Sequence, residues 1–336
     1  MPMVEHHNNF YAVIMAGGSG KRFWPLSSED FPKQFLTFGK KNTLIEQTVK
    51  RFLPLIKKRN IFIVSLEKQF PLLKKFLPNF PKQNLILEPA QKNTAACLAL
   101  SAFYLYEKDP TSIMIATPAD NWIDSKIKFH KNIKTAINLA AQYDVLITLG
   151  TRPTFPSTAY GYIQRKERFH ASAFKVKKFT EKPSLKLAQK FLRSKNYYWN
   201  GGIFIWKTAV FLRALRKHLP DTFKRLQNLS KLSKSKQKKA YESLQNISVD
   251  YAVMEKSTNC IVIPADFKWD DLGDLTKINQ KFIKHINIDS KNNLIHAHKT
   301  VATIGVEDLI IIENNGNLLI AKKDRAQDVK KISTSF

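Results

Sequence analysis

The sequence predicts an α/β protein with a mixed, mostly parallel central sheet and a small C-terminal β appendage. Short apolar runs alternate with segments of helical periodicity through the first 150 residues, as expected for a parallel sheet covered on both faces. A glycine cluster follows the first apolar run. From residue 285 onward, short alternating runs are separated by Asn, Asp and Gly, which predicts small strands.

The first half of the chain predicts alternating strands and helices. Strands are expected at residues 10–16, 60–65, 84–89, 112–120 and at the end of 137–150, and helices at 43–58, 93–108 and at the start of 137–150. Asn93 or Thr94 is expected to cap the helix at 93–108. Ligands bind outside the carboxyl ends of the strands in such sheets. The glycine cluster, Glu88 and Asp120 all follow strands and are therefore expected at one edge.

The pattern changes after residue 150. Strands are expected at 160–166, 174–183 and 198–206, and a helix at 184–196. Residues 207–246 are expected to be helical and very basic, with the segment KLSKSKQKK (231–239) as a mobile loop. We therefore expect a catalytic domain at 8–284 and a small β-rich domain at 285–336.

Composition narrows the class of protein. The chain has 336 residues, 43% of them hydrophobic, but no run of about 18 apolar residues, so no membrane span or membrane partner is expected. Two cysteines and the absence of a signal-like start favour a reducing, cytoplasmic setting. The net charge of +28 comes from scattered lysines, and we expect no nucleic-acid partner. This charge indicates either a solvated surface or a preference for anionic ligands such as nucleotides.

The segment MAGGSGKRFWP (15–25) has the composition of a phosphate-binding loop. Gly17, Gly18 and Gly20 let backbone N–H groups approach phosphates closely. Arg22 and Lys33 are nearby cations that can neutralise a triphosphate. The loop matches neither the Walker pattern nor the dinucleotide fingerprint, and a structural turn with surface cations is the alternative.

Acidic residues at expected strand ends suggest a magnesium site. Asp120 ends the run SIMIATPAD, and Asp270 and Asp271 occur together in WDDLG. Mg²⁺ takes one or two protein carboxylates and completes its shell with phosphate oxygens and water. A turn or cap acid is the alternative for Asp120, and a salt-bridge partner is the alternative for one member of the 270/271 pair.

A second set of residues suits a sugar phosphate. Glu181 and Lys182 in FTEKP place an acceptor for hydroxyls beside a cation for phosphate. Asn200 in WNGG offers an amide that can donate and accept, and Gly161 lets the backbone lie against a sugar ring. Each of these residues taken singly is compatible with a purely structural role.

In combination, these segments resemble the sugar-phosphate nucleotidyltransferases, in particular mannose-1-phosphate guanylyltransferases. The segment AVIMAGGSGKRFWPLSSEDFPKQF resembles the signature of that family. Further segments follow in the order of the family: EPAQKNTA, TPADNWI, GTRPTFPSTAYGYI, FTEKPSLKLAQKFLRSKNYYWNGGIFIW, DYAVMEKSTNCIVIPADFKWDDLGDL and the C-terminal VEDLIIIENNGNLLIAKKDRAQDVKKI. The resemblance covers residues 10–331.

The resemblance implies a Rossmann-like nucleotidyltransferase fold and a Mg²⁺-dependent enzyme that makes GDP-mannose and diphosphate from GTP and mannose 1-phosphate. The catalytic residues would be Arg22, Lys33, Asp120 and Asp271, with the two aspartates as metal ligands. Asp271 is chosen because it matches the family pattern W-x-D-x-G. The sugar phosphate would bind Gly161, Glu181, Lys182 and Asn200. The nucleotide would bind Gly17, Gly18, Ser19, Gly20, Arg22, Lys33, Glu88, Asn93 and Thr94.

Under this interpretation no protein nucleophile is needed, because the attacking phosphate oxygen is already ionised and catalysis consists of alignment and charge neutralisation. Glu88 would accept from guanine N1–H and N2–H₂. The chain departs from the family pattern at Ser157 and Ala159, beside the expected sugar pocket. Another sugar 1-phosphate or NTP, such as glucose 1-phosphate or UTP, therefore stays open, as does a catalytically silent polyanion-binding relative. A homodimer is also left open.

Overall fold

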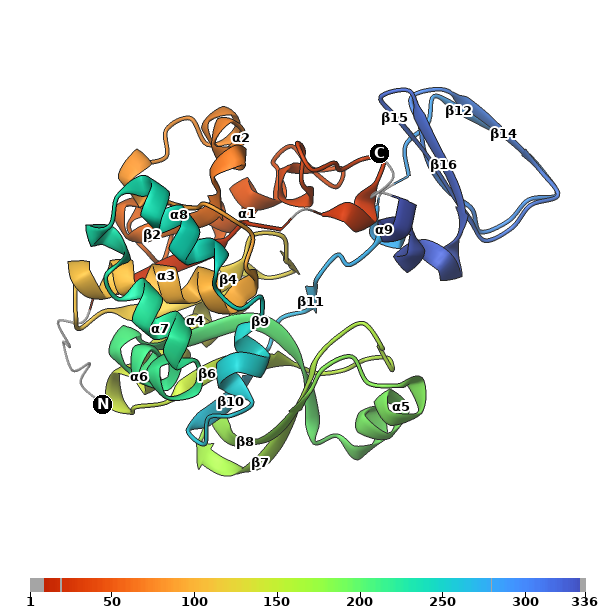
Figure 1. The fold of residues 1–336 in the computed structure, drawn as a ribbon. Helices are drawn as coiled ribbons and strands as arrows, with labels where there is room; N and C mark the ends of the chain where they lie inside the picture. Colours follow the sequence, from red (N-terminus) through yellow and green to blue (C-terminus); the bar gives the residue numbers. More distant parts are fainter. Residues whose placement is uncertain (1–8, 19, 279, 333–336) are drawn as a thin grey trace.

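A nine-stranded sheet dominates the computed structural model, which describes residues 9–18, 20–278 and 280–332. The strand order is β3-β2-β1-β4-β9-β6-β10-β8-β7 (Figure 1). The strands of this sheet are β1 (Phe10–Met15), β2 (Ile61–Leu66), β3 (Leu85–Glu88), β4 (Ile113–Pro118), β6 (Leu146–Thr151), β7 (Tyr162–His170), β8 (Ala173–Thr180), β9 (Tyr197–Lys207) and β10 (Cys260–Pro264). The helices are α1 (Leu44–Phe52), α2 (Phe70–Phe76), α3 (Asn93–Lys108), α4 (Lys126–Gln142), α5 (Leu185–Ser194), α6 (Thr208–His218), α7 (Pro220–Leu226), α8 (Lys234–Glu242) and α9 (Val329–Ile332).

Strand β1 lies inside the parallel part of the sheet, between β2 and β4. Because successive side chains of a strand point to opposite faces, Tyr11 and Val13 join the core cluster under α3, whereas Ala12 and Ile14 join the cluster under α1 and α4. Burial on both faces explains the continuous apolar run. The carboxyl ends of β1, β3 and β4 consequently meet at one edge, as predicted.

The other part of the sheet is largely antiparallel, which confirms the predicted mixed sheet. Strand β9 is antiparallel to both β4 and β6. Ala116, near the end of β4, pairs with Phe204 of β9. Because β9 runs in the opposite direction, the residues of β9 that precede Phe204 extend beyond the end of β4. Asn200 and Gly201 reach the same edge as Asp120 in this way.

A two-stranded sheet joins the two acidic segments. Strands β5 (Trp122–Ile123) and β11 (Trp269–Asp270) are antiparallel, and Asp270 pairs with Trp122. Asp120 lies two residues before β5, and Asp271 directly follows β11. This short ladder therefore brings together two carboxylates that are far apart in the sequence.

The basic segment 231–239 is not a loop, and the expectation of a mobile loop is wrong. A short 3-10 turn at Leu229–Lys231 leads into α8. The helix is anchored because Tyr241 is fully buried in the core cluster, followed by the buried Leu244. These apolar contacts outweigh the repulsion among the exposed lysines of α8.

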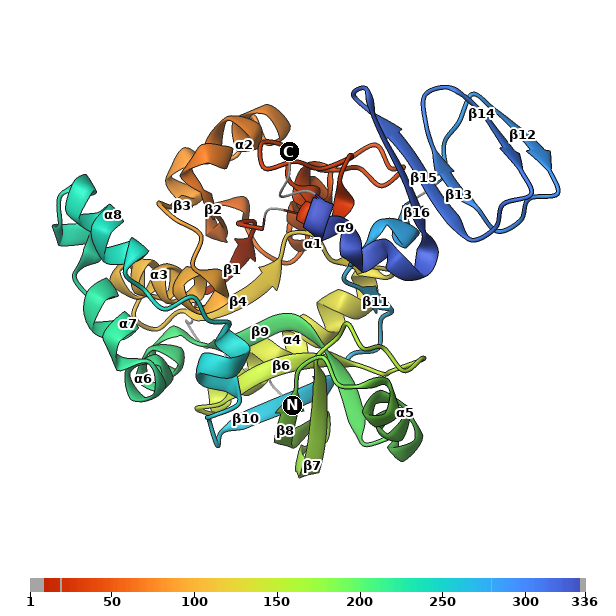
Figure 2. The same ribbon diagram turned by 45° about the vertical axis from the view of Figure 1, so that its right-hand side comes forward.

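The predicted C-terminal β appendage is confirmed. Its strands are β12 (Lys284–Ile288), β13 (Leu294–His296), β14 (Thr300–Ile304), β15 (Leu309–Asn314) and β16 (Asn317–Lys322). Strand β12 is parallel to β14 and β13 to β15, while β16 is antiparallel to β15. These strands lie to one side of the large sheet, and α9 contacts the turn at Lys21–Phe23 (Figure 2). Within the described ranges, no helix combines the length and apolar character needed to cross a bilayer.

Candidate active site

The glycine loop leaves β1 at the edge of the sheet. The Gln34 side chain supports it by donating from Nε2 to the carbonyl of Ala16 at 2.5 Å. Gly20 has a φ of +65°, and a Cβ there would lie 2.6 Å from the backbone nitrogen of Lys33. A Cβ at Gly17 would lie 2.9 Å from Oε2 of Glu88. Gly20 therefore requires glycine for steric reasons, whereas a Cβ at Gly17 would require the Glu88 carboxylate to shift.

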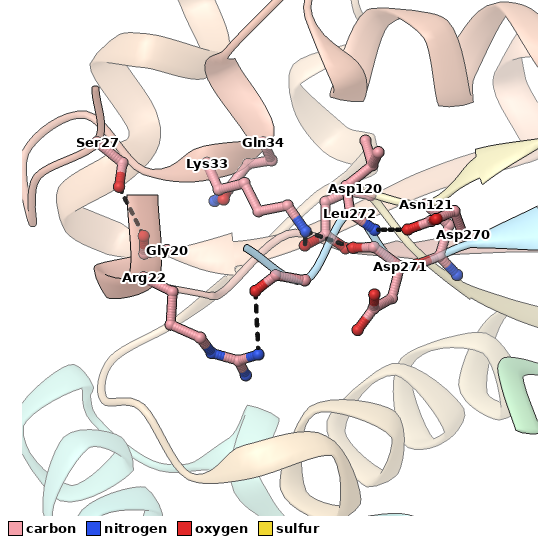
Figure 3. A network of polar contacts seen from close by, with 12 residues as sticks. Gly20, Arg22, Ser27, Lys33, Gln34, Asp120, Asn121, Asp270, Asp271 and Leu272 are labelled. Atoms are coloured by element: carbon pink, nitrogen blue, oxygen red, sulfur yellow. Dashed lines mark hydrogen bonds and ion pairs between the residues drawn. The ribbon is translucent and has the colours of Figure 1, made fainter. Parts of the chain in front are cut away.

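Lys33 connects the loop to both acidic segments. Its ammonium Nζ donates to Oδ2 of Asp120 at 2.8 Å and to the carbonyl of Asp271 at 2.6 Å (Figure 3). The side chain is buried, and its Nζ lies 5.2 Å from the centroid of the Phe23 ring. Arg22 faces the same region and donates from Nη1 to the carbonyl of Gly273 at 3.2 Å. The two predicted cations thus lie beside the two predicted carboxylates.

The Asp271 carboxylate is buried without a full set of partners. Its Oδ1 is buried and accepts no hydrogen bond from the part of the chain that the structure describes. Burial raises the pKa of Asp271, while the Lys33 ammonium acts to lower it. Asp270 is different, because its Oδ2 pairs with Lys277 at 2.7 Å and its Oδ1 accepts from the Leu272 amide. The structure therefore favours Asp271 over Asp270 as the acid that is available to a ligand.

The two carboxylates fit a magnesium ion. An unpartnered buried carboxylate oxygen on Asp271, next to Asp120, is the kind of donor set that Mg²⁺ uses. In the described ranges, no group of three or more His, Cys, Asp or Glu side chains could hold a metal ion by itself. An ion bound here would therefore depend on phosphate and water oxygens for its remaining ligands.

The predicted sugar-phosphate residues line the same cavity as the cations and the two acids. The Gly161 carbonyl accepts a hydrogen bond from the backbone N–H of Asn200 at 2.8 Å. A Cβ at Gly161 would collide with Oε2 of Glu181, so this glycine leaves room for the carboxylate. Glu181 Oε1 forms an ion pair of 3.1 Å with Lys182. All four residues line the cavity.

Sequence reasoning missed Asp250, which fixes the orientation of Asn200. The Asn200 Nδ2 donates to Oδ1 of Asp250 at 2.7 Å, and its Oδ1 accepts from the Gly202 amide at 3.2 Å and from the Thr148 hydroxyl at 3.3 Å. The amide oxygen is therefore used internally, so Asn200 offers a ligand one remaining N–H rather than both a donor and an acceptor. Asp250 itself lines the cavity. Asp250 is the first residue of DYAVMEKSTNC, a segment that carries the family resemblance, and this position was the only sequence signal that pointed to it.

A second cavity, of about 520 Å³, adjoins the glycine loop on its other side. Glu88 lies in it with one oxygen, Oε2, against Gly17, while Oε1 accepts from the Tyr241 hydroxyl at 2.5 Å. Burial raises the pKa of Glu88 to about 7. Asn93 and Thr94 also line this cavity, and their contact with the nucleotide stays a prediction.

The predicted cap of α3 is wrong. The capping position is Lys92, whose side chain makes no capping hydrogen bond. Asn93 is already the first helical residue and has a φ of +65°, and Thr94 Oγ1 instead accepts from the Val249 amide at 2.9 Å. Asn93 Oδ1 accepts from the Thr94 backbone amide at 2.8 Å, so a local and a long-range contact are both present at this end of the helix.

The predicted residues therefore fall into two adjoining cavities that share Gly18, Gln91 and Pro118. The larger, of about 620 Å³, contains the cations, the two acids and the sugar-phosphate residues, and it also receives Lys330 from the C-terminal appendage. Lys330 was not predicted. Ser19 lies outside the described residues. The roles given to these residues stay predictions, but their proximity is a property of the structure.

The chain is similar to known proteins over most of its length. The sequence matches the nucleotidyl transferase family over residues 11–286, and a domain described as MannoseP isomerase/GMP-like beta-helix over residues 283–334. Mannose-1-phosphate guanylyltransferase 2 of Escherichia coli O157:H7 is 34% identical over 348 residues, which cover 96% of this chain and 72% of that protein. Mannose-1-phosphate guanylyltransferase of Salmonella muenchen is 35% identical over 342 residues, covering 95% and 72%.

A solved structure is similar over nearly the whole chain. It comes from Thermus thermophilus and is described as a mannose-1-phosphate geranyltransferase. The TM-score is 0.87 at 30% identity, and the match covers 97% of this chain and 99% of that one. The protein is therefore an enzyme of the nucleotidyl transferase family, and its similarity places it among the mannose-1-phosphate guanylyltransferases.

Proposed function

We propose that the protein transfers the guanylyl group of GTP to α-D-mannose 1-phosphate and so forms GDP-mannose and diphosphate. One observation carries this proposal: the glycine loop with its cations, the two acids and the sugar-phosphate residues line a single cavity of about 620 Å³. The choice of mannose and guanine is supported by the names of the relatives.

The chemistry is an in-line displacement. An oxygen of the sugar phosphate forms a bond to the α-phosphorus of GTP while the bond from that phosphorus to the bridging oxygen of the β-phosphate breaks. The electron pair leaves with diphosphate. Because the attacking oxygen is ionised at neutral pH, no protein base has to remove a proton, and the protein contributes alignment and charge neutralisation. This fits a cavity whose polar side chains, apart from Tyr160 and Trp269, are cations, carboxylates and amides.

Arg22 and Lys33 would neutralise the triphosphate and the leaving diphosphate. Asp120 and Asp271 would hold Mg²⁺, which when bound neutralises charge on the phosphate oxygens. The contact of Lys33 with Asp120 and with the Asp271 carbonyl keeps this cation beside both carboxylates. Lys33 would then act on the same phosphates as a bound ion.

Base selection would depend on Glu88. Its carboxylate lies in the second cavity with Oε2 beside Gly17. A carboxylate can accept from guanine N1–H and N2–H₂, and adenine offers no such pair of donors at these positions. Tyr241 occupies the other oxygen, Oε1, and so orients the carboxylate.

A matrix of the four NTPs against mannose, glucose and other sugar 1-phosphates tests the proposal, with diphosphate release as the signal. We expect release only when GTP, mannose 1-phosphate and Mg²⁺ are all present. Diphosphate release with another pair of NTP and sugar 1-phosphate would change the assigned substrates but not the type of reaction. No release with any pair, together with salt-sensitive polyanion binding that survives Asp120→Ala and Asp271→Ala, would show a catalytically silent relative instead.

A further inference from the structure

The C-terminal appendage contacts the phosphate loop directly. Phe23, which is buried, shares an apolar cluster with Ala326 and Val329 of the appendage. Asn314, at the end of β15, donates from Nδ2 to the carbonyl of Pro25 at 2.8 Å. Helix α9 lies against the turn at Lys21–Phe23 (Figure 2). These contacts fix the position of the appendage relative to the loop.

A polar contact links the appendage to a predicted catalytic residue. Gln327 accepts at Oε1 from Nη1 of Arg22 at 3.4 Å and donates from Nε2 to Oδ2 of Asp274 at 2.8 Å. The same Arg22 Nη1 donates to Gly273, directly before Asp274. The guanidinium is therefore held between the segment after β11 and the appendage. This position keeps Arg22 on the wall of the larger cavity.

Lys330, three residues after Gln327, is itself part of that wall. It lines the larger cavity together with Gly18, Gly20 and Arg22. Its neighbour Lys331 has the same charge but does not line the cavity, and its ammonium pairs with Oδ1 of Asp328 at 2.8 Å. The two adjacent lysines therefore differ in their access to the site.

The charges at this end of the cavity suit a strongly anionic group. Arg22, Lys33 and Lys330 are there, and Lys21 lies on the same turn with its ammonium 3.0 Å from Glu29. Lys33 is shared with Asp120. A nucleoside triphosphate carries about four negative charges at neutral pH, and each phosphate group prefers a charge-assisted donor. An additional cation from the appendage matches this requirement.

We propose that Lys330 binds the β- and γ-phosphates of the nucleoside triphosphate and the diphosphate product, so that the appendage completes the phosphate site. This inference rests on the proposed function for the identity of the substrate. It gives the appendage a role in catalysis rather than in folding alone. Gln327 contributes as a positioning residue, because it holds the Arg22 guanidinium at the cavity wall.

Titration of inorganic diphosphate into the full chain with MgCl₂ tests the inference without any sugar or base. Loss of one charge-assisted contact predicts that Lys330→Gln weakens diphosphate binding about tenfold. The matched control Lys331→Gln removes the same charge one residue away and should leave binding within about twofold of wild type. Equal melting temperatures of the two variants would confirm that both are folded.

Kinetics provide the second measurement. Lys330→Gln should raise the KM for GTP and the inhibition constant of diphosphate by similar factors, and leave the KM for the sugar phosphate unchanged. Diphosphate binding that is unaffected by Lys330→Gln, or weakened equally by Lys331→Gln, would overturn the inference. An enzyme that turns over GTP and mannose 1-phosphate with either of those results would keep its proposed function. Conversely, Lys330-dependent diphosphate binding without turnover would reject the proposed substrates and retain the phosphate site.

Discussion

At the scale of single residues, the expectation for Asp250 follows from its hydrogen bond to Asn200. Asp250→Asn replaces a carboxylate, which can only accept, with an amide that can also donate, so the Asn200 side chain is held less firmly. We expect the KM for the sugar 1-phosphate to rise about tenfold, with an unchanged KM for GTP. Steady-state kinetics with each substrate varied in turn provide the measurement.

Glu255→Gln is the matched control for Asp250, because Glu255 is a nearby exposed acid that does not line the cavity. Its KM values should equal those of wild type. If Asp250→Asn raised both KM values equally, a general loss of structure would explain the effect better than the orientation of one amide.

The buried carboxyl of Glu88 predicts a pH-dependent stability. Burial raises its pKa in the folded protein from 4.5 to about 7, so the protonated form is favoured by folding. This stabilisation is complete below pH 4.5 and is lost as the pH rises through 7. Glu88→Gln lacks the charged form and should be more stable than wild type by up to ~3 kcal/mol at pH 8, with a much smaller difference at pH 5.

Urea unfolding of wild type and Glu88→Gln at the two pH values measures this difference. The same stability difference at pH 5 and pH 8 would contradict a raised pKa at Glu88. In the proposed reaction, the variant should also discriminate less between GTP and the other NTPs, because the Tyr241 hydroxyl would use the amide oxygen and the amide nitrogen cannot accept from guanine.

The assignment of Asp271 as a metal ligand predicts that Asp271→Asn abolishes turnover while the protein still folds. An amide is less costly to bury than a carboxylate, and burial already raises the pKa of Asp271. Asp270→Asn is the control, since the Asp270 carboxylate pairs with Lys277 outside the larger cavity, and it should retain most of the turnover. Activity of Asp271→Asn close to wild type would refute the assignment, and circular dichroism establishes that both variants fold.

At the scale of elements, the turn at Lys21–Phe23 connects the loop to the appendage through Phe23. Its side chain is 1% exposed and packs with Leu275, Ile310 and Val329. Phe23→Ala should reduce the free energy of unfolding by about 3 kcal/mol or more, as is usual for a buried phenylalanine. It should also raise the KM for GTP, because the adjacent Arg22 loses its support.

Denaturant unfolding and kinetics measure both consequences of Phe23→Ala. Phe282→Ala, a substitution of a phenylalanine that is 40% exposed, is the control and should cost much less. Unchanged stability of Phe23→Ala would mean that the apolar contact between the turn and the appendage contributes little.

The sequence allowed the elements of the first half to be predicted because their burial is simple. Strands β1, β2 and β4 are buried on both faces and therefore appear as short apolar runs. Strands β5 and β11 have two residues each and no pattern of their own. Helix α8 was expected as a loop because its lysines obscure the single buried Tyr241. For β5, β11 and α8, the contacts that determine the structure come from residues far away in the sequence.

The same distinction separates the predicted and the missed residues of the site. Asp120 follows a strand of the sheet, so its place at the edge could be inferred from topology. Asp250 lies in a π-helical turn, and its role depends on Asn200, fifty positions earlier. Lys330 reaches the cavity only because the appendage packs on Phe23. Tertiary packing of this kind has no local sequence signal.

At the scale of the whole molecule, the net charge of +28 predicts electrostatic steering of the substrates. A positively charged protein attracts anions over a distance that salt shortens. GTP carries more negative charge than mannose 1-phosphate. The KM for GTP should therefore rise more steeply than the KM for mannose 1-phosphate as KCl increases from about 50 to 300 mM. Kinetics at several salt concentrations measure the two slopes, and equal or zero slopes would assign the charge to a solvated surface without a role in substrate capture.

The bond between Lys33 and the Asp271 carbonyl joins residues that are 238 positions apart, and the bond between Arg22 and Gly273 spans 251. Closing such long loops costs conformational entropy and slows folding. A nascent polypeptide on the ribosome can therefore form its phosphate loop and the first strands long before residues 269–273 have been synthesised. On the proposed function, the site is complete only after this segment has docked against Lys33 and the appendage has packed on Phe23.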